Sequence, residues 1–336
     1  MMFWQLFADV LLSTLGSAWL VGRVRVWTLK RQILDIPNER SSHVMPIPRG
    51  GGIAILVAVS IVQTITIATG NLPLSIGLPW LLATLAYGVL GACDDRKPLS
   101  SRFRLLVQFG LAASYLGILC ITNHWPLSLL GAIAAGGVVL AIVWTVNLYN
   151  FMDGTDGIAG IQALAAAAGG ACLSANLNLP GIAFVSSSVA GASLGFLMWN
   201  WQPAKIFLGD VGSYFLGSQF ALLAINTALA GIEPWFWLIL LAPFIVDASL
   251  TLLRRIVRGE PWRSAHRSHA YQLLVRQRWT HRAVAASLFG VVAMGLGPLA
   301  WSVVKYPEFG LCVTALSFSL MTALWFAIVA RARALL

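Results

Sequence analysis

The sequence predicts an all-α, polytopic membrane protein, and three observations support this prediction. Hydrophobic residues make up 58% of the 336 residues and charged residues only 10%, and the mean hydropathy of +0.80 lies far outside the range of soluble globular domains. The apolar residues gather in blocks near twenty residues long, about the length of helix that crosses a ~30 Å hydrocarbon core. Lys and Arg lie almost entirely between those blocks.

We count eleven apolar blocks and expect about eleven transmembrane helices. No Lys or Arg precedes the first block, Asp9 lies inside it, and Arg23 and Arg25 follow it, so we expect a retained membrane helix rather than a cleaved signal peptide. The blocks cover approximately residues 2–22, 50–69, 74–92, 105–122, 128–147, 157–175, 180–198, 207–230, 235–253, 284–304 and 309–330.

The basic residues orient the predicted helices. When successive loops are assigned to alternate sides, 21 of the 22 Lys and Arg residues fall on one side, and only Lys305 falls on the other. Because Lys and Arg concentrate in cytoplasmic loops, the N-terminus is predicted outside and the C-terminus in the cytoplasm. The net charge of +10 is then mainly a topology signal that also suits anionic lipid and nucleotide phosphates, and we expect no nucleic-acid partner.

One integral membrane domain, residues 1–336, is the economical interpretation, because the sequence shows no internal repeat and no low-complexity segment. Four single cysteines without C-x-x-C spacing predict neither a disulfide nor a metal site. The outer loops are short, whereas the inner loops are longer and polar, so we expect the catalytic site on the cytoplasmic side. The inner loops are 23–49, 93–104, 147–157, 199–210 and 254–283.

Acidic residues are concentrated in or beside these inner loops. Carboxylates close to lipid are costly, so each needs a partner or a function, and topology explains the arginines but not paired aspartates. Seven of the twelve acidic residues form four groups, namely Asp35 with Glu39, Asp94 with Asp95, Asp153 with Asp156, and Asp210.

Asp94 and Asp95 lie at the inner end of the third block. Two adjacent carboxylates repel each other, and a cation or a neighbouring Arg is the usual remedy. A solvated helix end balanced by Arg96 and Lys97 is the alternative.

The segment 147–157 carries four polar side chains three residues apart: Asn147, Asn150, Asp153 and Asp156. On a helix or near-helical turn this spacing places them on roughly one side. Gly154 and Gly157 leave room for a ligand to approach the backbone. Capping of a membrane helix end is the alternative.

Two further loops favour phosphate and metal chemistry. Asp210 lies between Gly209 and Gly212, where a glycine turn that leads into a helix exposes N–H groups and the carboxylate offers a hard metal ligand. Arg49 precedes three glycines, a pattern that favours an anion site at the start of the second block. A common Gly-Asp turn and a plain connecting loop are the alternatives, and Pro37, Pro46 and Pro48 exclude a continuous helix in the first inner loop.

The last inner loop contains His266 and His269 with Arg263 and Arg267. Phosphate binding is favoured over zinc, because no Cys and no second His pair accompanies them. Aromatic and Leu residues in this loop predict either a short interfacial helix or a simple basic flank with aromatic anchors. Asp247, in the ninth block, is expected to be a structural partner, with a functional role left open.

Taken together, these motifs resemble the polyprenyl-phosphate N-acetylhexosamine-1-phosphate transferases, the group that also contains the phospho-MurNAc-pentapeptide transferases. The resemblance covers nearly the whole chain, because the segments 35–52, 94–95, 147–157 and 207–213 and the histidine loop occur in the family's order and topology. Typical peptidoglycan members show Asp-Asp-x-x-Lys and three consecutive histidines, whereas here Arg96, Lys97 and Pro98 follow the aspartates and the two histidines are separated. These departures weaken any role for Lys97 and favour the branch that uses simpler N-acetylated sugars.

The resemblance implies transfer of an N-acetylhexosamine 1-phosphate from a UDP-sugar to undecaprenyl or another polyprenyl phosphate, with release of UMP. It implies a bacterial inner-membrane enzyme whose site faces the cytoplasm, which uses Mg²⁺ or, in its place, Mn²⁺, forms a homodimer and initiates O-antigen or a related glycan. The alternatives are a phospho-MurNAc-pentapeptide transferase or, in a different class, an ion-coupled transporter, which predicts mid-membrane acidic residues and sequence repeats.

The implied roles can be assigned residue by residue. Asp210 is the principal Mg²⁺ ligand, Asp94 positions or deprotonates the lipid phosphate, and Asp95 supports it. The remaining site residues, grouped by role, are Gly154 and Asp156 at the uridine, Asn150 and Asp153 ordering the site, Phe207 on uracil, Arg104 in place of a family lysine at phosphate, and Asn147, Arg49, His266 and His269 binding the substrate.

Overall fold

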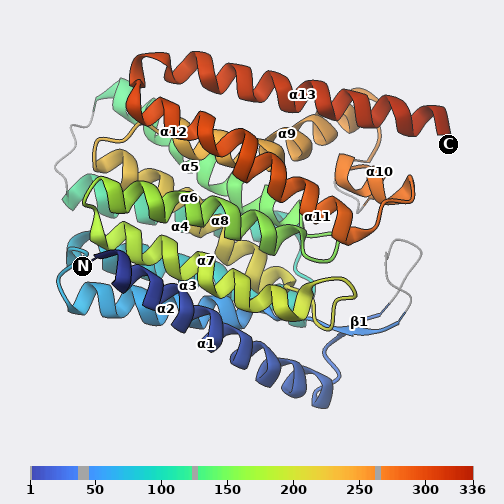
Figure 1. Ribbon diagram of the computed structural model, residues 1–336, viewed down its shortest axis with the longest axis horizontal. Coiled ribbons are helices and arrows are strands. Elements are labelled where there is room, and N and C mark those ends of the chain that lie inside the picture. The colour runs from blue at the N-terminus through green and yellow to red at the C-terminus, as the bar shows by residue number, and fades with distance from the viewer. Residues whose placement is uncertain (1, 37–44, 123–127, 262–265, 336) are drawn as a thin grey trace.

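The structure is a computed structural model that describes residues 2–36, 45–122, 128–261 and 266–335. Successive long helices run in opposite directions, and the two ends of the chain lie at opposite ends of the bundle (Figure 1). The helices are α1 (Met2–Lys30), α2 (Gly52–Ala68), α3 (Leu74–Arg96), α4 (Ser101–Thr122), α5 (Leu129–Phe151), α6 (Ile158–Asn176), α7 (Pro180–Asn200), α8 (Gly209–Leu229), α9 (Trp235–Val257), α10 (Ala270–Arg276), α11 (His281–Gly290), α12 (Gly297–Lys305) and α13 (Gly310–Leu335).

The predicted apolar blocks all lie in helices. One π-helical turn, Val291–Leu296, joins α11 to α12, so the tenth block is a single continuous helical segment. Within the described residues, nine helical segments have the length and apolar composition of a membrane span. Helix α2 has 17 residues and is shorter than that, and α8 is not among the nine. The all-α polytopic fold is therefore confirmed, whereas the count of eleven spans and their orientation stay predictions.

The predicted first inner loop, 23–49, is partly wrong, because α1 continues to Lys30. Nothing in that stretch breaks a helix, and prolines occur only from Pro37 onward. The loop also contains a small antiparallel hairpin of β1 (Leu34–Asp35) and β2 (Ile47–Pro48), a feature that the prediction of an all-helical chain did not include.

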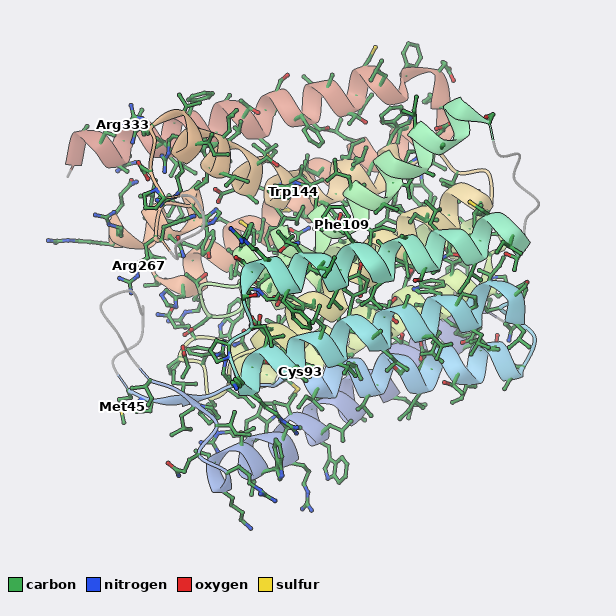
Figure 2. All side chains as sticks on the ribbon, turned by 180° about the vertical axis from the view of Figure 1, so that it is seen from behind. Met45, Cys93, Phe109, Trp144, Arg267 and Arg333 are labelled. Atoms are coloured by element: carbon green, nitrogen blue, oxygen red, sulfur yellow. The ribbon has the colours of Figure 1, made fainter. Side chains whose placement is uncertain are left out.

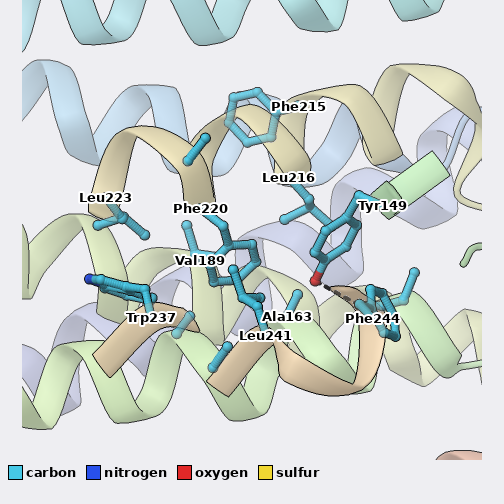
Figure 3. Close-up of a cluster of buried hydrophobic side chains, with 14 of the residues drawn as sticks. Tyr149, Ala163, Val189, Phe215, Leu216, Phe220, Leu223, Trp237, Leu241 and Phe244 are labelled. Carbon is cyan, nitrogen blue, oxygen red and sulfur yellow. Dashed lines mark hydrogen bonds between the residues drawn. The ribbon is translucent and has the colours of Figure 1, made fainter. Parts of the chain in front are cut away.

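Aromatic side chains fill the centre of the bundle. Tyr149 of α5 stacks on Phe220 of α8 with a centroid separation of 5.5 Å and meets Phe244 of α9 edge-on at 5.1 Å (Figure 3). The Tyr149 hydroxyl donates to the Ala159 carbonyl at 3.4 Å, so the buried phenol has a partner. This cluster packs α5, α8 and α9 against one another close to the end of α5 at Phe151.

Helix α1 packs against α7 through small residues. A Cβ atom on Gly195 would lie 2.3 Å from the Thr14 carbonyl oxygen, and one on Gly191 would lie 2.5 Å from the Val10 carbonyl oxygen. The Ser17 hydroxyl donates across the contact to the Ala192 carbonyl at 2.8 Å. Two glycines four residues apart allow the backbones of neighbouring membrane helices to approach this closely.

Gly195→Ala is expected to destabilise the protein, because the new methyl group meets backbone that cannot move without separating α1 from α7. The expected cost is ~1–3 kcal/mol, as for other overpacked sites, and it would appear as a lower thermal midpoint in detergent. Gly110→Ala in α4 is the matched control, since nothing lies within 4 Å of its Cβ position. Equal midpoints for the two variants would contradict the close-packing interpretation.

The polar loops gather at one end of the bundle, which we call the polar end. It holds the hairpin, α10 and the segments 97–100, 152–157 and 201–208 (Figure 1). Seen from behind, Met45, Arg267 and Arg333 lie at this end, whereas Phe109 and Trp144 lie along the wall of the bundle (Figure 2). This agrees with the prediction that the longer loops share one side.

Candidate active site

Helices α3 and α8 meet at the polar end with almost no space between their backbones. A Cβ atom on Gly91 would lie 2.2 Å from the Asp210 carbonyl oxygen, and Gly209 turns the chain into α8 with a φ of +78°. This close approach brings Asp94 and Asp95, at the end of α3, beside Asp210, at the start of α8. The structure thus joins two motifs that are more than a hundred residues apart.

Asp95 caps the start of α8. Its two carboxylate oxygens accept from the Asp210 and Val211 backbone N–H groups at 3.0 and 3.1 Å, and Arg49 Nε lies 3.2 Å from Oδ1. Negative charge is favourable at a helix N-terminus. Arg49 is held in turn by β2 and by pairing of its backbone with Phe207. Asp95 therefore fixes the Asp210 turn, consistent with the supporting role predicted for it.

Asp94 is buried and accepts three hydrogen bonds. Arg104 Nη1 lies 2.7 Å from Oδ2, the Tyr214 hydroxyl donates to the same oxygen at 3.0 Å, and the Leu99 N–H donates to Oδ1 at 2.8 Å. Sequence reasoning missed Tyr214 and Leu99. The available signal for Tyr214 was its position four residues after Asp210, which places both on one face of α8.

Asp210 and Asp153 form the acidic centre of the site. Asn150 donates to Asp210 Oδ1 at 2.7 Å and also contacts the Ser213 hydroxyl at 3.1 Å. In the described part of the chain, the Asp153 carboxylate makes no hydrogen bond to a protein group. Burial, followed by the nearby Asp210 carboxylate, raises the pKa of Asp153 well above its usual range. A cation between these carboxylates would relieve that repulsion.

Mg²⁺ prefers oxygen ligands in octahedral geometry. Among the described residues, no group of three or more His, Cys, Asp or Glu side chains is placed to hold a metal ion. Mg²⁺, however, is commonly held by one or two carboxylates, with water and substrate phosphates completing the octahedron. Asp210 and Asp153 supply hard oxygen donors of that kind, and the residues present fit the ion.

The structure does not bring Asn147 and Asp156 into this centre. Asn147 Nδ2 donates to Gln108 Oε1 at 2.6 Å, one helical turn deeper than Asn150. Asp156 Oδ2 accepts from the Ala204 N–H at 3.1 Å, while its Oδ1 lies 3.3 Å from His281 Nδ1. The predicted common side is wrong for Asp156, because α5 ends at Phe151 and helical spacing does not extend past it, whereas Asn147 lies within α5 one turn before Asn150.

A second cluster lies at α10. The Asp247 carboxylate accepts from the Ala270 and Tyr271 N–H groups at 2.9 and 3.3 Å, and His269 Nδ1 lies 3.5 Å from it. Asp247 thus caps α10 and lies against His269, as expected of a structural partner. The short helix predicted in this loop is present, although its seven residues pack against α13 and α11 inside the protein.

His266 and His269 lie together, with ring centroids 5.0 Å apart. Burial, with further contributions from His269 and the nearby arginines, lowers the pKa of His266 to about 4. Near neutral pH this imidazole is uncharged and offers a hydrogen bond rather than a positive charge. Arg263 lies outside the described residues.

The segment after α5 connects the two clusters. A Cβ atom on Gly154 would lie 2.1 Å from the Tyr271 hydroxyl oxygen, and that hydroxyl donates to the Phe151 carbonyl at 3.0 Å. Phe151 also stacks on His269 with a centroid separation of 6.4 Å. Gly154 is therefore required for contact with α10, which differs from the ligand clearance predicted for it.

Known proteins resemble this chain over most of its length. Residues 78–228 match the family model for glycosyl transferase family 4. The chain is 30% identical over 279 residues to a probable undecaprenyl-phosphate N-acetylglucosaminyl 1-phosphate transferase of Bacillus subtilis (strain 168), covering 76% of this chain and 73% of that protein. It is 31% identical over 316 residues to a decaprenyl-phosphate N-acetylglucosaminephosphotransferase of Mycobacterium leprae, covering 82% and 78%. A phospho-N-acetylmuramoyl-pentapeptide-transferase of Synechococcus sp. is 29% identical over 326 residues, covering 87% and 90%.

Proposed function

Because the chain belongs to the polyprenyl-phosphate N-acetylhexosamine-1-phosphate transferases of glycosyl transferase family 4, an enzyme family, we propose that it moves an N-acetylhexosamine 1-phosphate from a UDP-sugar to a polyprenyl phosphate. The observation that carries the proposal is the cluster at the polar end, where Asp94, Asp95 and Asp210 lie among Arg49 and Arg104. Buried carboxylates beside arginines suit two phosphate substrates and a cation.

The chemistry is an exchange of phosphate partners. An oxygen of the lipid phosphate forms a bond to the sugar-bearing phosphorus, and the bond from that phosphorus to UMP breaks. Both reactants are anionic, so positioning and charge neutralisation dominate. Mg²⁺, held by Asp210 and Asp153, would supply positive charge at the diphosphate.

The protein's own residues have separate tasks in this scheme. Arg104, whose side chain is 32% exposed, can reach an entering phosphate, whereas Asp94 is enclosed. The second pKa of a phosphomonoester is ~6, so the lipid phosphate is largely ionised at neutral pH, and Asp94 acts as a base only on the protonated fraction. Asp95 and Arg49 keep the Asp210 turn in place.

The UDP-sugar is proposed to lie between the acidic centre and α10. His269 and His266 flank the segment that follows α5, and Phe207 is half-buried beside Arg49, where its ring can stack on uracil. Relatives named for N-acetylglucosamine and for N-acetylmuramoyl-pentapeptide substrates have similar identity to this chain. The separated histidines favour the simpler N-acetylated sugar, and initiation of O-antigen or a related envelope glycan at the cytoplasmic face of the bacterial inner membrane is part of the proposal, as is a homodimer.

Release of UMP tests the proposal. Purified protein in detergent is incubated with Mg²⁺ or Mn²⁺, undecaprenyl phosphate and a panel of UDP-N-acetylhexosamines, including 6-deoxy forms and UDP-MurNAc-pentapeptide. We expect UMP and a lipid-linked sugar diphosphate in equal amounts, only when both substrates and the metal are present. A protein that releases no UMP with any member of the panel, yet moves ions across vesicle membranes, would instead be a transporter.

His269→Ala is expected to lower turnover and to raise the KM for the UDP-sugar, by about tenfold or more in kcat/KM, because a group near the sugar diphosphate is lost. His269 is only 4% exposed, so it lies inside the protein rather than at the membrane surface. His266→Ala is measured in parallel. An anchoring role predicts small effects that depend on anionic lipid and fade at high salt. Wild-type kinetics in both variants would contradict the substrate role.

A further inference from the structure

Three protein groups hold Asp94, and they differ in how freely they can leave it. Arg104 and the Tyr214 hydroxyl both contact Oδ2, and the Leu99 N–H contacts Oδ1. The side chain of Arg104 is 32% exposed, whereas Tyr214 is 1% exposed and lies in the interior of the α3–α8 contact. Only Arg104 can turn towards a ligand at the polar end.

An entering phosphate competes with Asp94 for Arg104. The guanidinium presents several N–H donors in a fixed plane and pairs with phosphate through two of them. When it does so, Asp94 Oδ2 loses its strongest donor while a negatively charged group lies nearby. Repulsion would then drive the Asp94 carboxylate away from the phosphate that it serves.

We propose that Tyr214 is a positioning residue, whose hydroxyl keeps Asp94 in place while Arg104 moves from Asp94 to the phosphate of the lipid substrate. This inference rests on the proposed function. Tyr214 can do this because its hydroxyl donates to the same oxygen as Arg104 and its side chain is buried.

When Arg104 leaves Asp94, one lone-pair site on Oδ2 becomes free to accept a hydrogen bond or a proton. A carboxylate oxygen offers about two lone-pair sites, and Arg104 and Tyr214 occupy both in the substrate-free protein. Departure of Arg104 leaves one site free while Tyr214 keeps the oxygen oriented. If the lipid phosphate is protonated, its proton passes to Oδ2 through that site, and the phosphate oxygen keeps the electron pair that forms the new bond to phosphorus.

Tyr214→Phe tests the inference, because it removes the hydroxyl and keeps the ring. We expect kcat to fall about ten- to a hundredfold, the loss typical of one hydrogen bond to a charged group. The KM for the UDP-sugar should change less than twofold. Tyr115→Phe is the matched control, since Tyr115 is also buried and hydrogen-bonded, through Asn226, but lies away from the site.

A double-mutant cycle separates positioning from a packing effect. Tyr214→Phe combined with Arg104→Lys should lower kcat by more than the product of the two single losses. Each single variant keeps one of the two native donors to Asp94 Oδ2, whereas the double variant keeps neither. Independent losses, or an unchanged kcat in Tyr214→Phe, would overturn the inference. If Tyr214→Phe lowers the amount of folded protein, rates are taken per folded molecule. A KM for the UDP-sugar that changes less than twofold then supports positioning, and a larger change indicates a disrupted site. Wild-type protein that releases no UMP would refute the proposed function itself, which is a different result.

Discussion

Asp210→Asn is expected to abolish transfer, with turnover at least about a hundred- to a thousandfold lower, because a metal ligand that stabilises developing charge contributes several kcal/mol to the transition state. The change removes one charge and little volume. Asn still offers an oxygen that can accept the Asn150 hydrogen bond, and the backbone N–H that Asp95 caps is unaltered. The fold should therefore be retained.

The measurement is UMP release as a function of Mg²⁺ concentration, together with the thermal midpoint in detergent. Glu233→Gln is the control, since Glu233 is an exposed carboxylate in the α8–α9 connection, away from the polar end. A wild-type midpoint with no turnover at any Mg²⁺ concentration is the expected outcome. Near-normal turnover at saturating Mg²⁺ would rule out Asp210 as the principal ligand.

Asp94→Asn is expected to reduce turnover about a hundredfold or more, within the range attributed to general bases. If Asp94 acts as a base, the loss should be greater at low pH than at high pH. Below the second pKa of the phosphate, ~6, the lipid phosphate keeps a proton that the carboxylate can remove and the amide cannot. Above that pKa the proton is already gone, and the variant loses only positioning.

The ratio of wild-type to Asp94→Asn turnover, measured from about pH 6 to 9, decides between these roles. A ratio that falls as pH rises supports proton removal. A constant ratio assigns Asp94 to positioning alone. Because Arg104 loses its ion pair in this variant, the KM for the lipid phosphate should be measured as well, and a lower KM would show that Arg104 has become free for phosphate.

The sequence predicted helix locations well, because a membrane span must bury about twenty apolar residues and its ends are marked by charges and prolines. The burial cost of carboxylates near lipid singled out Asp94, Asp95 and Asp210, and the resemblance to the transferase family implied that they share one site. The sequence could not predict which hydrogen-bond donor contacts which of these carboxylates. Those contacts depend on the close approach of Gly91 to the Asp210 backbone, which no local pattern shows.

Two differences between prediction and structure have separate physical origins. Asp156 was placed on one side with Asn150 by assuming helical spacing from 147 to 157. The helix ends at Phe151, so Asp156 turns towards Ala204 and His281 instead. Tyr214 was missed because an aromatic residue in an apolar helix reads as packing, and its acidic partner lies on another helix.

The contact between α1 and α7 affects how the protein is made. Helix α7 begins about 150 residues after α1 ends, a delay of about 10–30 s at ordinary rates of synthesis. During that time the Ser17 hydroxyl lacks its acceptor on α7, the Ala192 carbonyl, whereas the Thr14 hydroxyl keeps its bond to the Val10 carbonyl within α1. Helix α1 therefore completes its polar contacts with α7 only after more than half of the chain has been synthesised.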